Sequence, residues 1–482
     1  MRPIKFSSFV LSSIVIILIS CSCKKKIVDN PTTPIVPPSV ESEVGLWITK
    51  GDRSALLEKQ NVSLNFSTTT NANATIEVDE SQTFQSIDGF GYTLTGGSAT
   101  LINNLPTAQK DALIKELFST EEGCIGVSYL RLSIGASDLS ANVFTYNERQ
   151  TGQTDVNQDH FSISSEMTDL IPILKKIIAI NPSIKIMGSP WTAPTWMKSN
   201  KAFKGGSLLP EYYQAYAKYF VKYIQAMKNE GVTIDAITIQ NEPLHPGNNP
   251  SMYMEARDQA TFIKTALGPT FKAAGISTKI IVYDHNADRP DYPISILNDP
   301  EAKTYVDGSA FHLYGGDISA LSTVRNAHPD KHIYFTEQWV GGPSNFGADL
   351  KWHVSTLIVG ATRNWSRNVL EWNLAADANY QPHTPDGGCT SCLGAITIAP
   401  AISRNVAYYV IAHASKFVRP GSVRIGSNLV GQLSNVAFKT PEGKRVAIVM
   451  NNSPDTQVFN IKHNGKIITS NLSGGAVGTY VW

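Results

Sequence analysis

Short apolar runs with strand character alternate with amphipathic helical stretches across the middle of the chain. Eight β-runs follow one another: Ile87–Thr93, Ser128–Ile134, Ile184–Ser189, Ile234–Gln240, Lys279–Asp284, Gly308–Tyr314, His332–Thr336 and Asn368–Asn373. Helical stretches with apolar residues three and four apart are Pro106–Phe118, Asp169–Ile180, Glu211–Asn229, Arg257–Ala274, Asp349–Thr362 and Asn405–Phe417. This alternation predicts an α/β fold, a (β/α)8 TIM barrel over residues 84–418.

Both ends of the chain have strand texture without helical periodicity. The N-terminal part, residues 45–83, offers Val44–Thr49, Val62–Phe66 and Ala74–Val78 as candidate strands. Residues 419–482 offer Val423–Ile425, Val436–Thr440, Arg445–Asn451, Gln457–Ile461 and Gly478–Trp482. Because the N-terminal runs are too few to bury a sheet face alone, the two ends are predicted to form one side β-sandwich.

The first residues have the pattern of an export signal. Arg2 and Lys5 precede the apolar run Phe9–Ile19, which is short for a membrane span and typical of a signal peptide. Residues 1–20 are therefore predicted to be a lipoprotein signal peptide, with Cys21 lipidated, or Cys23 as the alternative. An uncleaved signal anchor is the other reading, and residues 21–44 form a flexible tether. The predicted location is the outer membrane, at the cell surface or the periplasmic face.

Charge is balanced, with 41 basic and 40 acidic residues and a formal net charge of +1. This balance gives no electrostatic reason to expect nucleic acid, and the lipid anchor is the only membrane attachment that we expect. No spaced cluster of His and Asp indicates a metal, so we predict no metal and no cofactor, and we expect a monomer. Cys389 and Cys392 form either a loop-closing disulfide or two free thiols, since no second pair completes a zinc site.

Two of the β-runs end in a glutamate. Glu337 follows His332–Thr336, and Glu242 follows Ile234–Gln240 and precedes Pro243. In a parallel barrel the carboxyl ends of the strands meet on one face. We therefore expect these two carboxylates to lie close together.

The chain resembles glycoside hydrolase family 30, which includes acid glucosylceramidases and endo-β-1,6-glucanases. The resemblance runs from about residue 84 to the C-terminus. It rests on Asp88–Gly91, Tyr129–Ile134, Ser189–Trp196, Gln240–Pro243, Phe311–Tyr314, Thr336–Glu337 and Glu371–Leu374. The resemblance implies a retaining enzyme that holds its two carboxyl groups about 5 to 5.5 Å apart.

The same resemblance implies roles for particular residues. Glu242 would be the acid and base, protonated in the free enzyme, and Glu337 the ionised nucleophile. Arg131 would orient Glu337, Tyr314 would donate to it, and Asn241 would bind the 2-hydroxyl of the sugar. The further substrate-binding residues that it implies are Trp191, His312, Trp372 and His383.

Simpler roles stay open for some of these residues. Trp191 and Trp372 are also read as core residues, and His312 as a buried histidine with satisfied hydrogen bonds. Arg131 lies inside an apolar β-run, where its charge needs a partner.

Two departures from the glucosylceramidases bear on the substrate. Gly96 and Gly97 stand in the segment where glucosylceramidases carry an acidic residue, and His383 stands where they carry asparagine. Losing the acid is expected to make room for another linked sugar, as in the β-1,6-glucanase branch. The predicted function is retaining hydrolysis of β-1,6-linked glucan. The alternatives are a glucosylceramidase or other β-glucosidase or β-xylanase activity, and a non-catalytic surface lipoprotein that binds glycans.

Overall fold

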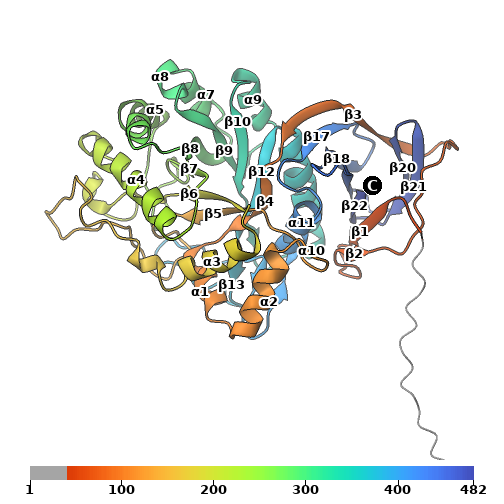
Figure 1. The fold of residues 1–482 in the computed structure, drawn as a ribbon, viewed down its shortest axis with the longest axis horizontal. Coiled ribbons are helices and arrows are strands. Elements are labelled where there is room, and N and C mark those ends of the chain that lie inside the picture. Colours follow the sequence, from red (N-terminus) through yellow and green to blue (C-terminus); the bar gives the residue numbers. More distant parts are fainter. Residues whose placement is uncertain (1–40) are drawn as a thin grey trace, which may run out of the picture. The chain divides into compact units, whose positions relative to one another are not determined.

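Eight parallel strands close into a barrel in the larger part of the molecule (Figure 1). The computed structural model describes residues 41–482. The barrel strands are β4 (Gly89–Thr93), β5 (Tyr129–Ser133), β6 (Lys185–Ser189), β7 (Ala236–Thr238), β8 (Lys279–Ala287), β9 (Val306–Gly316), β10 (His332–Glu337) and β12 (Ser366–Asn373). The predicted TIM barrel is confirmed, and each predicted β-run contains or overlaps one of these strands.

Side chains from seven of the barrel strands fill its interior. One cluster contains Tyr129, Met187, Ala236, Ile281, Ala310, Tyr334 and Leu370. These residues are apolar or aromatic and buried, so the barrel is a packed core rather than a pore. This packing gives the polar residues at the carboxyl ends of the strands a rigid floor.

Helices surround the barrel (Figure 1). They are α1 (Gly96–Asn103), α2 (Thr107–Phe118), α3 (Leu170–Ile180), α4 (Tyr213–Asn229), α5 (Ala256–Phe262), α6 (Gly268–Ala273), α7 (Asp291–Leu297), α8 (Pro300–Lys303), α9 (Ala320–Ala327), α10 (Phe346–His353) and α11 (Val406–Ser415). The π-helical turns Ile263–Leu267 and Val354–Ala361 extend α5 and α10. The sequence did not predict α1, α7, α8 and α9, which have eight residues or fewer.

Strands from both chain ends form a nine-stranded sheet beside the barrel. In spatial order they are β2 (Glu58–Lys59), β1 (Gly45–Thr49), β22 (Val477–Val481), β19 (Arg445–Asn451), β18 (Leu433–Lys439), β17 (Val423–Ser427), β3 (Ala74–Ser86), β20 (Gln457–His463) and β21 (Lys466–Leu472). Their inward-facing residues enclose a second apolar core. The predicted side β-sandwich from both ends is confirmed, although β21 was missed.

One predicted strand is wrong. Val62–Phe66 has an alternating pattern, yet only Leu64 of this segment is buried. The segment is held by single contacts, such as the N–H of Val44 donating to the carbonyl oxygen of Leu64 at 3.1 Å, and not by a ladder. A two-residue strand, β2, lies next to β1 instead.

Short strands tie down the loops above the barrel. They are β11 (Val340–Gly341), β13 (Ala375–Ala376), β14 (Cys392–Leu393), β15 (Ile396–Thr397) and β16 (Ser403–Arg404). β11 pairs with β14, so the loop after β10 is joined to the loop that contains Cys392. That connection fixes the segment next to Glu337.

A buried histidine links the barrel to the sandwich. His413 in α11 lies with Nδ1 2.8 Å from Oγ1 of Thr479 in β22 and Nε2 2.8 Å from Oγ1 of Thr49 in β1. Burial lowers the pKa of His413 to about 3, so the ring is neutral at physiological pH.

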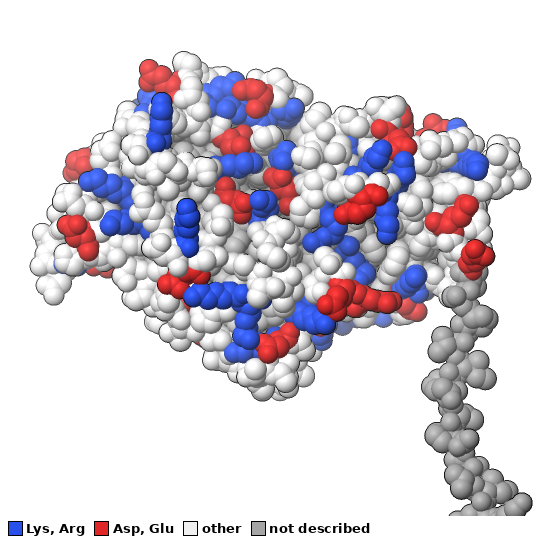
Figure 2. All heavy atoms as spheres, in the orientation of Figure 1, with Lys and Arg blue, Asp and Glu red and all other residues white. Residues whose placement is uncertain are grey.

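Acidic and basic residues are interspersed over the face that Figure 2 shows. In residues 41–482 no helix is both long and apolar enough to cross a membrane. The predicted signal peptide, the lipidation of Cys21 and nearly all of the tether fall outside the described residues.

Candidate active site

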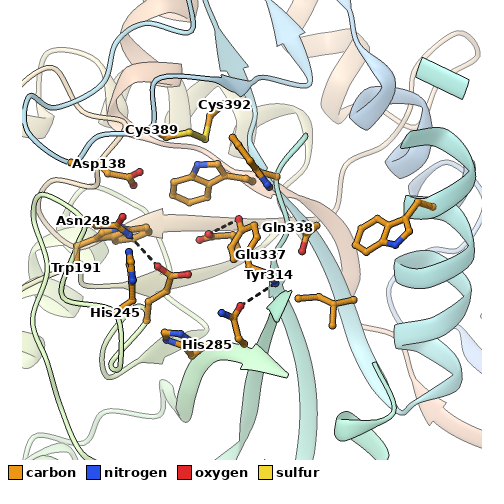
Figure 3. Close-up of a pocket in the computed structure, with 17 residues that line it drawn as sticks. Asp138, Trp191, His245, Asn248, His285, Tyr314, Glu337, Gln338, Cys389 and Cys392 are labelled. Carbon is orange, nitrogen blue, oxygen red and sulfur yellow. Dashed lines mark hydrogen bonds between the residues drawn. A yellow bond between two sulfur atoms is a disulfide. The ribbon is translucent and has the colours of Figure 1, made fainter. Parts of the chain in front are cut away.

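A cavity of about 680 Å³ opens at the carboxyl ends of the barrel strands (Figure 3). Three carboxylic side chains line it, those of Asp138, Glu242 and Glu337. Five large aromatic residues also line it: Trp191, Tyr314, Trp339, Trp352 and Trp372. Apolar faces with a few convergent polar groups are the usual composition of a small-ligand site.

The two strand-end glutamates meet in this cavity. Glu242 is 8% exposed and Glu337 is 5% exposed. One carboxylate oxygen of each, together with a ring nitrogen of His312, lies within 4.8 Å of the others. This spacing is near the separation of about 5 to 5.5 Å in retaining glycosidases, and below the roughly 6.5 to 9.5 Å of inverting ones.

Irregularities at the strand ends direct these side chains inward. The pairing of β10 with β9 shifts register between Phe335 and Glu337, and β8 shifts between Tyr283 and His285. Glu242 has a left-handed backbone, with φ of 45°, and its N–H donates to the carbonyl oxygen of Asp284 at 2.9 Å. Such bulges and strained residues are common at active sites, because they let neighbouring side chains face the same side.

Glu337 is held by two donors. Nη1 of Arg131 donates to Oε2 at 2.6 Å, and the hydroxyl of Tyr314 donates to Oε1 at 2.9 Å. Arg131 is completely buried, and its Nη2 also donates to Oδ1 of Asn241 at 2.6 Å. Nδ2 of Asn241 has no hydrogen-bond partner within residues 41–482. The expected contacts of Arg131 and Tyr314 with Glu337 are thus present in the structure.

Asp284 lies beneath both glutamates, and the sequence analysis did not find it. Five donors surround its carboxylate, in Arg131, Ser189, Thr238, His312 and Thr336, at 2.6 to 3.1 Å. Burial opposes its charge, but Arg131 and His312 hold the pKa of Asp284 well below its usual range. The signal was the buried Arg131, whose charge requires more than one partner.

His312 joins Asp284 to Glu242. Its Nε2 lies 3.1 Å from Oδ1 of Asp284, and its Nδ1 lies 3.3 Å from Oε1 of Glu242. Burial opposes a charged ring, yet the carboxylates of Glu337, Asp284 and Glu242 raise the pKa of His312 to about 9.

The pKa values of Glu242 and Glu337 are shifted in opposite directions. Burial would raise the pKa of Glu242, but the hydrogen bond and the charge of His312 outweigh burial and lower it. Burial raises the pKa of Glu337, against the opposing effects of His312 and Arg131. The predicted assignment, a protonated Glu242 and an ionised Glu337, stays a prediction. Nδ1 of His312, 3.3 Å from Oε1 of Glu242, is placed to exchange a proton with this carboxyl group.

Two tryptophans and a disulfide form an apolar side of the cavity. The rings of Trp191 and Trp372 are 5.4 Å apart, and the guanidinium of Arg131 lies 4.8 Å from the first and 5.8 Å from the second. Cys389 and Cys392 are joined by a disulfide, and both line the cavity. This resolves the alternative that the sequence left open between a disulfide and free thiols.

Asp138 is an acidic residue on this side that the sequence analysis missed. Its burial, followed by the charges of Glu337 and Glu242, raises the pKa of Asp138 to about 8. The N–H of Gly97 donates to the carbonyl oxygen of Leu139 at 2.9 Å, so the segment after β5 packs directly on Gly97. A Cβ at Gly97 would lie 2.5 Å from that oxygen, which explains the glycine. Pro382 also lies against Gly97 and Ser140 against Gly96, so protein atoms fill the space expected beside these two glycines.

Three predicted substrate-binding residues, Asn241, His312 and His383, are not among the residues that line the cavity. Asn241 and His312 lie below the cavity surface and contact Arg131 and Glu242, respectively. His383 is not brought to the cavity: its ring contacts Nε2 of Gln381 and the carbonyl oxygen of Thr384.

The same centre is the candidate for a metal. Within residues 41–482, the cluster of His and carboxylate atoms close enough to hold an ion consists of Glu242, His312 and Glu337. The fixed positive charge of Arg131, bonded to Glu337, opposes a cation at this place.

The (β/α)8 barrel and its paired carboxylates define a glycoside hydrolase. The family model described as the glycosyl hydrolase family 30 TIM-barrel domain matches residues 87–418, and the model of the family 30 β-sandwich domain matches residues 421–480. The chain therefore belongs to glycoside hydrolase family 30, as its motifs indicated.

Named relatives differ in the reactions that their names describe. The endo-1,6-β-D-glucanase of Neurospora crassa is 36% identical over 400 residues, covering 78% of this chain and 81% of that protein. The solved structure of the endo-β1,6-glucanase BT3312 has 36% identity and a TM-score of 0.86, covering 92% of this chain and 99% of that one. The lysosomal acid glucosylceramidase of Mus musculus is 28% identical over 430 residues, covering 83% of this chain and 81% of that protein.

Proposed function

We propose that this enzyme hydrolyses β-1,6-linked glucan by double displacement. The observation that carries the mechanism is the pair of buried glutamates whose oxygens lie within 4.8 Å in one cavity. The relatives named endo-β-1,6-glucanases, at 36% identity, support the choice of substrate.

In the first step Glu337 attacks the anomeric carbon. Arg131 and Tyr314 each donate to one of its oxygens, and a carboxylate accepts both hydrogen bonds. The bond from the anomeric carbon to the glycosidic oxygen breaks, and Glu242 gives that oxygen a proton. His312, 3.3 Å from Glu242, can supply the proton that Glu242 passes on, and Glu242 is left as a carboxylate when the leaving group departs.

In the second step Glu242 acts as a base. Esterification removes the negative charge of Glu337, which leaves Glu242 without a like charge nearby. Glu242 then takes a proton from water, whose oxygen attacks the anomeric carbon and releases Glu337 as a carboxylate. The anomeric configuration is retained because it is inverted twice.

The apolar wall and the amide of Asn241 would hold the sugar that is attacked. Trp191 and Trp372 offer faces to the ring, and the free Nδ2 of Asn241 would bind its 2-hydroxyl. Asp138, protonated at neutral pH because its pKa is about 8, would both donate to and accept from sugar hydroxyls.

The substrate is tested by product analysis on β-1,6-, β-1,3- and β-1,4-glucans, with an aryl β-glucoside and glucosylceramide in parallel. We expect the fastest turnover on β-1,6-gluco-oligosaccharides, with products released in the β-configuration. Equal or faster turnover of glucosylceramide or the aryl glucoside would overturn the substrate and favour the glucosylceramidase alternative.

We also propose export as an outer-membrane lipoprotein that acts as a monomer. The support is in the sequence alone, in the apolar run followed by Cys21. Labelling with radioactive palmitate should mark the wild type and not Cys21→Ala. If Cys21→Ala is still labelled and replacement of Cys23 removes the label, the lipid is attached to Cys23 instead. Sedimentation of the chain without its signal tests the monomer.

A further inference from the structure

The cavity wall beside Glu242 contains polar side chains that take no part in the two proposed displacement steps. His285 and Asn286 come from the end of β8, and His245 comes from the loop after Glu242. In Figure 3, His245 and His285 lie on the side of the cavity away from Asp138 and the disulfide. The sequence analysis singled out none of the three.

The bulge in β8 places His285 in this wall. Regular strands point consecutive side chains to opposite faces, but the register shift lets Asp284 and His285 both face the barrel end. Asp284 is bound by donors within the barrel, whereas His285 lines the cavity. Its ring is stacked parallel to that of His312, with centroids 6.4 Å apart.

His285 also has unused hydrogen-bonding capacity. It is 7% exposed, and neither of its ring nitrogens has a hydrogen-bond partner in the part of the chain that the structure describes; Nδ1 is itself buried, so Nε2 is the nitrogen that a ligand can reach. Burial, opposed by the charge of Glu242, lowers its pKa to about 4, so the ring is neutral. A neutral imidazole offers one donor and one acceptor, which is what a sugar hydroxyl group can use.

Asn286 has a similar free group. Its Oδ1 accepts the N–H of Tyr314 at 3.0 Å, and its Nδ2 has no partner within residues 41–482. By contrast, Nδ2 of Asn248 donates to Oε2 of Glu242 at 3.0 Å and is already engaged. His245 is exposed and stands at the rim.

The role of Glu242 as acid identifies the sugar that contacts this wall. Glu242 protonates the leaving oxygen, so the departing sugar must lie on the side of Glu242. We propose that His285, with Asn286 beside it and His245 at the rim, forms the subsite for the leaving-group glucose. This inference rests on the proposed function, because it assumes that the leaving group is a sugar.

The same subsite would receive an incoming sugar. In the glycosyl-enzyme, a hydroxyl of a bound acceptor can replace water: its oxygen bonds to the anomeric carbon, the bond to Glu337 breaks, and its proton passes to Glu242. His285 should therefore influence the ratio of transfer to hydrolysis, a ratio that a purely structural residue would not change.

The test compares wild type, His285→Ala, His285→Gln and a control, His332→Gln. His332 begins β10 at the opposite end of the barrel, and its side chain is 41% exposed. The substrates are a β-1,6-linked glucotetraose, whose leaving group is a sugar, and β-glucosyl fluoride, whose leaving group is one atom. Transfer is measured with the fluoride as donor and gentiobiose as acceptor.

We expect His285→Ala to lower kcat/KM on the tetraose about tenfold, which is the effect of losing one hydrogen bond. Its kcat/KM on glucosyl fluoride should stay within about twofold of the wild-type value. The transfer ratio should fall together with kcat/KM on the tetraose, and His285→Gln should restore part of both. An equal loss on both substrates, or an unchanged transfer ratio, would overturn the subsite. If wild type does not cleave the tetraose, the proposed substrate fails first, and the transfer ratio with the fluoride still decides the role of His285.

Discussion

His312→Gln tests where the acid proton is held. In the wild type Nδ1 of His312 lies 3.3 Å from Oε1 of Glu242, and the pKa of His312 is raised to about 9. Glutamine keeps a donor and an acceptor but cannot bind the proton. Glu242 must then hold it alone, without the charge of His312 that lowers its pKa.

The size of the effect follows from those pKa values. A buried catalytic glutamic acid typically titrates at about 6 to 7. The alkaline limb of kcat/KM should therefore move down by about two pH units from the value near 9 set by His312. Above the new limb the rate falls tenfold per unit, so the variant should lose about 100-fold in mildly alkaline buffer and far less in acid.

The assay is the pH dependence of kcat/KM on a β-1,6-gluco-oligosaccharide. A 2,4-dinitrophenyl glucoside serves as the comparison, because its leaving group needs no proton and its alkaline limb should not move. His332→Gln controls for loss of an imidazole far from the cavity. If the limb for the oligosaccharide stays at the wild-type pH, the proton is not shared with His312 and the reasoning fails.

Three further predictions concern the nucleophile, metals and stability in acid. Glu337→Gln should abolish hydrolysis while calorimetry still detects oligosaccharide binding, and unchanged turnover would remove it as nucleophile. Prolonged dialysis against EDTA should leave activity intact, since the proposed steps use only protein groups; a loss restored by one divalent ion would refute this. The pKa of His413 is about 3 in the folded protein and about 6.5 in an unfolded chain, so stability is lost as the pH falls below 6.5. Between pH 6.5 and 4.5 this loss amounts to about 2 kcal/mol, and in urea titrations the free energy of unfolding of His413→Gln should fall less over this range than that of the wild type.

The sequence predicted the parts of the site that lie in regular strands. Glu242 and Glu337 were found because each ends a recognisable β-run, and a parallel barrel brings such ends together. Arg131 was found because a charge inside an apolar run needs a partner, and that partner is the expected Glu337. Local pattern and the closed barrel are sufficient for these residues.

What the sequence missed depends on departures from regular geometry. A bulge at the end of β8 puts both Asp284 and His285 at the site, where an alternating strand would allow one. Asp138 lies in the loop after β5, which no periodicity describes, and it reaches the cavity because Gly97 lets that loop approach closely. The place of His312 between Asp284 and Glu242 was not predicted, because it depends on three residues that come from three different strand ends.

The pairing of β1 with β22 brings the first and last strands together, with Gly45 opposite Val481. A short peptide could therefore connect Trp482 back to Glu41 without disturbing the sheet, and new termini could be cut at the exposed hairpin turn Asn464–Gly465. Such a circularly permuted enzyme should keep its catalytic centre, and it would carry any fused anchor or label on an edge hairpin.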